Sequence, residues 1–296
     1  MRYINFIFII NIILGQVITD NSFNSTRSIS LAGATVSNPG KIESVFSNPA
    51  NLSSSTKSSF LIGNTNFYEQ NFLSYEYISI LYSSSKNKNI ALSMQRLGTN
   101  TKDNDNMLSS EESISLSQGF TLLDDKNSTL RLGYNINYFI YKQGKTAGTL
   151  GDGSNGLPAK KISSYGIDLG ILASLREKIV MGAFIKNINS PSIGRNNNGQ
   201  YLPRRMNIGF SYIPMDRLVT MFNYEKNINS KVAQFRVGLE YELHKFFILR
   251  TGVQMKPNKI GFGFSSLVND NIILSYGVLT DPILPLTHSF ELELRY

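Results

Sequence analysis

The sequence contains no cysteine, no tryptophan and only two histidines. Without cysteine the chain can form neither a disulfide nor a thiolate metal site, so packing and backbone pairing must hold it together. The histidines, His244 and His288, have no Ser, Asp or Glu at a known catalytic spacing, and the chain carries no phosphate-binding glycine loop or zinc motif. The sequence therefore predicts a protein that is not an enzyme and has no catalytic residue, cofactor or metal site.

A long apolar run is also missing. The stretch from Ile4 to Leu14 is shorter than the roughly 18 residues that indicate a transmembrane helix. It follows the charged residue Arg2 and ends at the small residue Gly15, before a polar stretch begins. This order is typical of a secretory signal peptide, to which we assign residues 1–15. If the rest of the chain crosses a membrane, it must do so as a closed barrel of strands.

The charge is basic but not concentrated. The formal net charge is +8 and the sequence pI is about 9.4. The lysines and arginines are dispersed, and the chain shows neither a block of basic residues nor a recognised nucleic-acid motif. These features favour a solvated basic surface and predict no nucleic-acid partner.

From Lys57 to the end, apolar and polar residues alternate with a period of two, which indicates strands with two different faces. The pattern predicts about fourteen strands, each near the ~9–11 residues with which a tilted strand crosses a bilayer. An even number is typical of single-chain bacterial barrels. The predicted strands are 57–68, 71–83, 88–97, 110–122, 128–142, 161–173, 177–187, 203–213, 216–225, 231–243, 245–255, 257–266, 270–279 and 286–296.

The connections between these strands carry a second signal. Every second connection is short and turn-like, whereas several of those between them are longer, notably 98–109, 143–160 and 188–202. Short periplasmic turns that alternate with longer outer loops are typical of transmembrane barrels.

A soluble β-sandwich also alternates, but its strands usually have only ~5–6 residues. The apolar face here collects rings suited to the girdles at the two bilayer interfaces. These are Tyr75, Tyr77, Tyr134, Tyr138, Phe210, Tyr212, Phe222, Tyr224 and Tyr241. We therefore predict an all-β protein: a transmembrane antiparallel β-barrel of about fourteen strands over residues 57–296, embedded in the lipid of a bacterial outer membrane.

The opposite face of the strands is rich in glycine and charge. Charged side chains are costly toward hydrocarbon, so we expect them to face the lumen. The glycines leave two interpretations open, because they can provide lumen space or mark bends. The predicted lumen-facing residues are Arg131, Asn135, Asp168, Arg236, Glu240, Glu242, Glu291 and Glu293.

The last predicted strand ends on an aromatic residue. Its apolar positions are Phe290, Leu292, Leu294 and Tyr296. Such an ending resembles the targeting signal read by the outer-membrane barrel-assembly machinery, which would then be a partner of this chain. The alternative is an amphipathic strand that is merely the last one.

Two segments precede the first predicted strand: TRSISLAGA at 26–34 and VFSNPANL at 45–52. Their order and spacing resemble the N-terminal signature of the FadL-like outer-membrane proteins, and of their PorV/PorQ branch in particular. Ala32 and Asn51 depart from it, since glycine is usual at both positions. The resemblance implies that residues 16–56 form a hatch inside the barrel; the alternative is a periplasmic lead-in. The hatch motif residues are Arg27, Gly33, Asn48, Pro49, Ala50 and Leu52.

The resemblance implies two functions. The PorV/PorQ branch implies a non-enzymatic component of type IX protein secretion or cargo attachment, with secretion-system proteins or secreted cargo as partners. The chain is short for FadL transporters, whose loops form an external ligand groove, and this favours the secretion role. The alternative is passive transport of hydrophobic or small molecules across the outer membrane.

Overall fold

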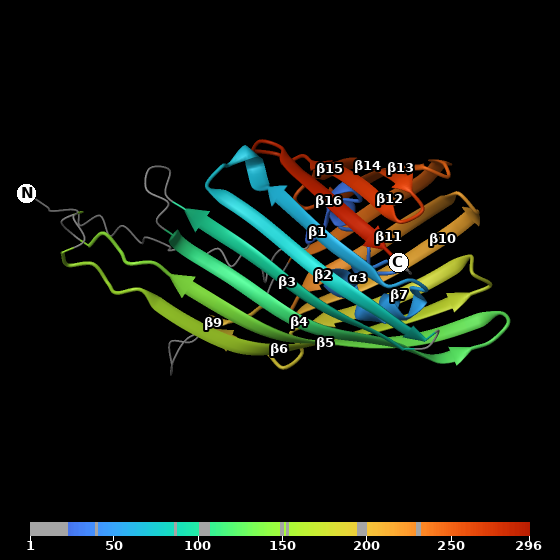
Figure 1. Ribbon diagram of the computed structural model, residues 1–296, viewed down its shortest axis with the longest axis horizontal. Helices are drawn as coiled ribbons and strands as arrows, with labels where there is room; N and C mark the ends of the chain where they lie inside the picture. Colours follow the sequence, from blue (N-terminus) through green and yellow to red (C-terminus); the bar gives the residue numbers. More distant parts are fainter. Residues whose placement is uncertain are drawn as a thin grey trace, which may run out of the picture.

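The computed structural model describes residues 23–38, 41–85, 88–100, 107–148, 151, 154–193, 200–228 and 232–296, so the predicted signal peptide lies outside the described residues. Fourteen strands form a single closed antiparallel barrel (Figure 1). The first strand pairs with both the second and the last, which closes the sheet. The predicted all-β barrel of fourteen antiparallel strands is therefore confirmed. Within the described ranges, no helix has the length and apolar character needed to cross a membrane.

Each barrel strand hydrogen-bonds to its neighbours along the chain, except that β7 pairs with β10. The sequence predicts a plain loop between these two, whereas the structure places a small separate sheet there, β8 (Ser192–Ile193) with β9 (Gln200–Tyr201). The barrel strands are β1 (Ser59–Asn66), β2 (Leu73–Ser85), β3 (Lys88–Asn100), β4 (Met107–Asp124), β5 (Ser128–Gln143), β6 (Lys160–Leu175), β7 (Ile179–Lys186), β10 (Arg205–Met215), β11 (Leu218–Asn227), β12 (Ala233–His244), β13 (Phe247–Met255), β14 (Lys259–Asn269), β15 (Ile272–Leu279) and β16 (Thr287–Arg295).

The barrel is taller on one side than on the other. Strands β4, β5 and β6 have 18, 16 and 16 residues, whereas β1, β7 and β15 have eight each. The tall side reaches far to the left in Figure 1. The short turns lie at the opposite end, where β1 begins and β16 finishes. Short turns mark the periplasmic end of such barrels, so we name the two ends periplasmic and outer.

The outward face of the wall is apolar and aromatic, as an exterior in contact with lipid requires. Tyr212, Phe222 and Tyr241 are exposed on it, as the sequence predicts. The prediction is wrong for Tyr75 and Tyr77, which face the lumen and are only 1% and 2% exposed. The alternation misleads here because the outward positions at the outer end of β2 are polar, so that the inward tyrosines seem to belong to the apolar face.

The described part of the hatch, residues 23–38 and 41–55, lies inside the barrel and is almost entirely buried (Figure 1, blue). It contains α2 (Thr26–Ser30), α3 (Ser44–Ser47) and the 3-10 helix η1 (Pro49–Ser54); a further 3-10 helix, η2 (Phe67–Glu69), lies between β1 and β2. Ser25 caps α2, since its hydroxyl accepts from the Ser28 amide at 3.1 Å. Asn48 caps η1 and proline occupies the first turn, where no amide is needed. These caps explain why the Asn-Pro pair stands where it does.

Candidate functional site

The hatch follows the inner wall and touches it through glycines. As the hatch proceeds, its contacts move from β15 backwards through the strand order to β4. A Cβ at most of these glycines would collide with hatch atoms, so glycine lets two backbones approach closely. The sequence left two interpretations of these glycines open, lumen space or bends. The structure supports lumen space, because hatch atoms occupy the space beside them. The facing pairs include Thr26–Gly277, Leu31–Gly252, Val36–Gly182, Asn48–Gly170, Ala50–Gly133 and Pro49–Gly119.

Asn48 is the most connected residue of the hatch motif. Its side-chain amide donates to the carbonyls of Val36 at 3.0 Å and Ile171 at 3.1 Å, and its oxygen accepts from the Ala50 amide at 3.1 Å. One side chain thus joins two parts of the hatch to β6. Leu52 packs in the apolar cluster around Phe46.

The two departures from the family motif have visible consequences. Ala32 has a φ of +47°, in the left-handed region that glycine adopts more readily. The following Gly33, at φ +84°, lies against the side chain of Arg236. Asn51 uses its side chain to donate to the Val36 carbonyl at 3.2 Å, a bond that glycine could not make.

Three cations of the lumen surround the carboxylate of Glu240, and we call this group the ionic anchor. Arg27 of the hatch donates to both its oxygens, at 2.9 and 3.1 Å. Arg250 of β13 donates at 2.7 Å, and Lys41 of the hatch lies 3.6 Å away. Because the group is buried, its members depend on one another for charge compensation.

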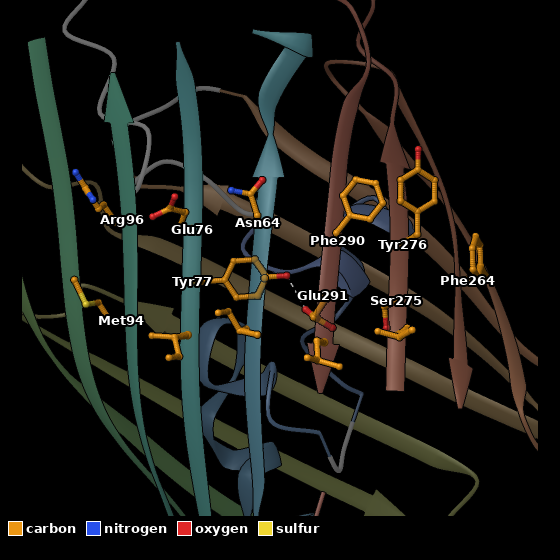
Figure 2. Close-up of a pocket in the computed structure, with 15 residues that line it drawn as sticks. Asn64, Glu76, Tyr77, Met94, Arg96, Phe264, Ser275, Tyr276, Phe290 and Glu291 are labelled. Carbon is orange, nitrogen blue, oxygen red and sulfur yellow. Dashed lines mark hydrogen bonds between the residues drawn. The ribbon is translucent and has the colours of Figure 1, made fainter. Parts of the chain in front are cut away.

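A hydroxyl network holds the start of the hatch to β2 and β16. The hydroxyl of Tyr77 donates to Glu291 at 2.7 Å and accepts from the Thr26 amide at 3.0 Å. The Thr26 hydroxyl lies 2.7 Å from that of Ser289. Figure 2 shows Tyr77 reaching across β1 toward Glu291 on β16. Its ring covers the inner side of Gly63, where a Cβ would collide with it.

A third charged group lies nearer the outer end. Arg236 donates to Glu225 and to Gln254, both at 2.8 Å, and Arg205 lies 3.5 Å from Glu225. The ring of Phe23, at the start of the described hatch, lies 5.7 Å from the Arg236 guanidinium.

The remaining predicted lumen residues occupy several levels. Asp168 accepts from the side chains of Asn135 at 3.2 Å and Asn137 at 2.8 Å, and Asn135 also donates to the hatch at the Val45 carbonyl. Arg131 and Glu242 are half-buried toward the periplasmic end. Arg236, Glu240, Asn135 and Glu291 thus meet the hatch directly.

The inner side of β3 to β5 is lined by small neutral polar residues, a feature that our site prediction missed apart from Asn135. Its signal is the serine at every second position of β4, within SISLS at 113–117. Two small cavities lie beside the hatch: one of about 30 Å³ between it and β10 to β12, and one of about 10 Å³ at the inner side of β3 to β5. Phe46 lines both. The second is bounded by Val45, Phe46, Gln95, Ser113, Ser115, Asn135, Asn137, Phe139, Asp168 and Lys186.

The outward face carries an apolar groove of about 860 Å³ over β1 and its neighbours (Figure 2). Ile62, Ile78 and Phe290 are among the apolar residues that line it. Its upper rim holds Asn64, Glu76 and Arg96, as labelled in Figure 2. The groove therefore faces lipid and has a polar edge at its outer end.

The C-terminal strand continues this outward face. Phe290 and Tyr296 are 61% and 68% exposed, and Leu292 and Leu294 are half-buried on the same side. On the inner side, Arg295 holds Glu293 at 2.8 Å.

Neither histidine lies in a catalytic arrangement. His288 lies 2.8 Å from the hydroxyl of Tyr276 and 3.3 Å from Glu69, and His244 stacks obliquely near Phe246. Across the ranges that the structure describes, no three His, Cys, Asp or Glu side chains are placed to hold a metal ion.

No family model and no curated protein matches this sequence. Solved structures do match in fold. They include the toluene transporters TbuX of Ralstonia pickettii, at TM-score 0.63, and TodX of P. putida, at 0.62, and a Pseudomonas aeruginosa FadL homologue at 0.56. Each is 11% identical over 92% of this chain and 98% of its own. These neighbours are transporters and not enzymes, and the fold of the chain is that of the FadL-like fourteen-stranded barrels of bacterial outer membranes.

Proposed function

We propose that this protein is a passive outer-membrane channel for small molecules, closed by residues 23–55. The observation that carries the proposal is a lumen filled by a segment outside the barrel sheet. The hatch is held by side-chain bonds and glycine contacts, and its backbone belongs to no barrel strand. Such a segment can move while the sheet stays closed.

The structural neighbours support this proposal. TbuX and TodX are toluene transporters and CymD is a monoaromatic hydrocarbon channel, at TM-scores of 0.62 to 0.64. All combine transport of a small solute with this barrel architecture. The comparison therefore favours transport over secretion for the present chain.

A reversible lock tests the proposal. The hydroxyls of Ser37 on the hatch and Ser211 on β10 lie 2.7 Å apart, a separation compatible with a disulfide after replacement of both by cysteine. Because the chain has no cysteine, only the introduced pair can form the bond. We expect the Ser37→Cys/Ser211→Cys protein to admit solutes into proteoliposomes when reduced and to exclude them when oxidised. Each single variant serves as the control, and equal permeability in both redox states would refute gating by the hatch.

A second candidate, a component of type IX secretion, is supported by the order of the two N-terminal motifs at 26–34 and 45–52. In a host that secretes by this route, loss of the chain should then leave cargo proteins unsecreted or unattached. The locked Ser37→Cys/Ser211→Cys protein separates the two roles. If it restores secretion without transporting solutes, secretion is the function.

A further inference from the structure

We infer that the solutes taken by this channel are small, neutral and rich in hydroxyl groups, as polyols and small sugars are. This inference rests on the proposed function and assigns the contact surface to the inner face of β3, β4 and β5, with the facing part of β10 and β11. We call this surface the polar wall; it consists of Asn89, Ser93, Gln95, Ser113, Ser115, Ser117, Asn135, Asn137, Asn207 and Asn223.

All residues of the polar wall are at most 6% exposed. Strand pairing arranges them in rows, since Ser93 lies opposite Ser115 and Ser115 opposite Asn137. Where the hatch backbone packs directly on the wall, the wall residue is often glycine. Here hydroxyl and amide groups are repeated instead, at positions that the hatch does not fully use.

Several side-chain atoms of the polar wall have no hydrogen-bond partner in the part of the chain that the structure describes. Within the described residues, no hydrogen bond reaches the hydroxyls of Ser93 and Ser117 or the side-chain oxygens of Asn135, Asn207 and Asn223. Buried polar groups are costly when they are unpaired. Most of these atoms are oxygens that can only accept, so they suit a solute that brings O–H donors.

Two charged residues beside the polar wall, Asp168 and Arg236, already have hydrogen-bond partners. Asp168 accepts three hydrogen bonds, the third from the Asn187 amide at 2.8 Å. Arg236 binds Glu225, Gln254 and Gln234. The unpartnered side-chain atoms of the polar wall itself all belong to neutral groups, which favours an uncharged solute.

The two small cavities lie between the hatch and the polar wall, and we infer that the solute passes there. Asn135 and Ser115 line one cavity, and Asn207 lines the other. A volume of about 30 Å³ accommodates about one water molecule. A sugar therefore needs Phe46 and the neighbouring hatch segment to move. Once they move, the solute meets hydroxyl and amide groups on one side.

An aromatic hydrocarbon would find no such match along this surface. It would strip water from the amides and hydroxyls without replacing the lost hydrogen bonds, which disfavours its entry. An open apolar groove lies on the other side of the wall, around Ile62 and Phe290.

The test is a swelling assay with proteoliposomes that contain the reduced Ser37→Cys/Ser211→Cys protein. L-Arabinose and erythritol are the neutral probes, and sodium gluconate is the charged probe. Toluene uptake is measured in cells that express the same protein. We expect entry of the neutral probes and exclusion of toluene and gluconate. Toluene uptake without arabinose entry would overturn this inference and leave the channel function standing, whereas entry of no probe in either redox state would overturn the channel function itself.

A double variant tests the wall directly. Ser93→Ala/Ser117→Ala removes two unpaired hydroxyls, which should leave the melting temperature equal or higher because no bond is lost. We expect arabinose entry to slow about fivefold, as for the loss of about one hydrogen bond. The matched control is Ser163→Ala, since Ser163 is exposed on β6. An unchanged rate in the double variant would show that the polar wall does not contact the solute.

Discussion

The hatch meets two unlike sides of the inner wall. Toward β12 to β16, with β2, it is held by charge and by hydroxyl networks, through Arg27 to Glu240 and Thr26 to Tyr77. Toward β3 to β5 it faces neutral serine, asparagine and glutamine, several of which have a side-chain atom with no hydrogen-bond partner among the described residues. We call these the anchored side and the polar side. The contrast indicates that the hatch is fastened on one side and can separate on the other.

The difference also reflects how much each contact costs to break. A buried ion pair that loses one partner leaves an uncompensated charge, at a cost of about 3–5 kcal/mol. A neutral hydrogen bond is worth about 1 kcal/mol, and water can replace it. If the hatch moves as a body, it should therefore pivot on the anchored side and open a path along the polar side.

The largest expected effect comes from adding a side chain at a glycine of the anchored side against which the hatch backbone packs. In Gly252→Val the new Cβ would overlap the backbone of Leu31, so the hatch cannot keep its position. We define hatch engagement as the free energy by which the hatch bound in the lumen is favoured over the released hatch. We expect this free energy to fall by about 3 kcal/mol or more, seen as an open conductance in planar bilayers and protease cleavage within residues 23–55. The control is Gly98→Val, because a Cβ at Gly98 meets nothing within 4 Å. A closed Gly252→Val channel would show that this contact does not seat the hatch.

Removal of an anchor charge should have the next largest effect. Arg27→Ala takes one cation from Glu240 but leaves Arg250 and Lys41, so we expect a loss of about 2–3 kcal/mol of hatch engagement. The readout is the salt and urea dependence of channel opening. The control is Lys142→Ala, which breaks the partly exposed pair with Glu112 and should change opening by about 1 kcal/mol or less. If Arg27→Ala and Lys142→Ala changed channel opening equally, the anchored side would hold the hatch no more strongly than the polar side.

The barrel was predictable from the sequence because its exterior must be apolar along every strand. Lipid imposes a period of two on the outward positions, and this gave both the strand number and most strand positions. The rule weakens at the outer end of β2. There the outward positions carry Ser74 and Glu76, which lie beyond the apolar band. The sequence therefore predicts the wrong face for the inward residues Tyr75 and Tyr77.

The interior was harder to predict because its partners are distant in sequence. Arg27 binds a residue 213 positions away, and no local sequence pattern indicates that Leu31 packs against Gly252. The glycines were visible, but their purpose became clear only with the hatch in place. Residues of the polar wall resembled solvated strand positions, since serine and asparagine occur on any exposed face.

A smaller effect is expected where a hydroxyl alone is removed from the anchored side. Tyr77→Phe keeps the ring over Gly63 but loses the bonds to Glu291 and the Thr26 amide. We expect about 1–2 kcal/mol weaker hatch engagement, measured as earlier protease cleavage in rising urea. Tyr82→Phe is the control, since Tyr82 is 62% exposed on the outward face. If both variants resist urea equally, the hydroxyl network contributes nothing to closure.

The smallest effect concerns pH and involves Lys41. Burial, together with the neighbouring Arg27 and Arg250, lowers the pKa of Lys41 from 10.5 to about 8, although Glu240 and Glu43 act in the opposite direction. Three cations share one carboxylate, so the least tightly bound gives up its proton most easily. A released hatch restores the ordinary pKa of Lys41, so between about pH 8 and 10.5 the released state binds more protons than the engaged one. Engagement should therefore strengthen as the pH rises through this window, and Lys41 should cause no pH dependence below it.

The measurement is protease cleavage of the hatch as a function of pH, in the intact protein and in Lys41→Met. We expect cleavage of the intact protein to slow as the pH rises above about 8, and Lys41→Met to lack this part of the pH dependence because it has no proton to lose. Subtracting the two profiles removes the groups that titrate in both proteins. If the profiles coincide, or if cleavage of the intact protein speeds up, the assignment of Lys41 as the weakest member of the ionic anchor is wrong, and the anchored side would be held equally by all three cations.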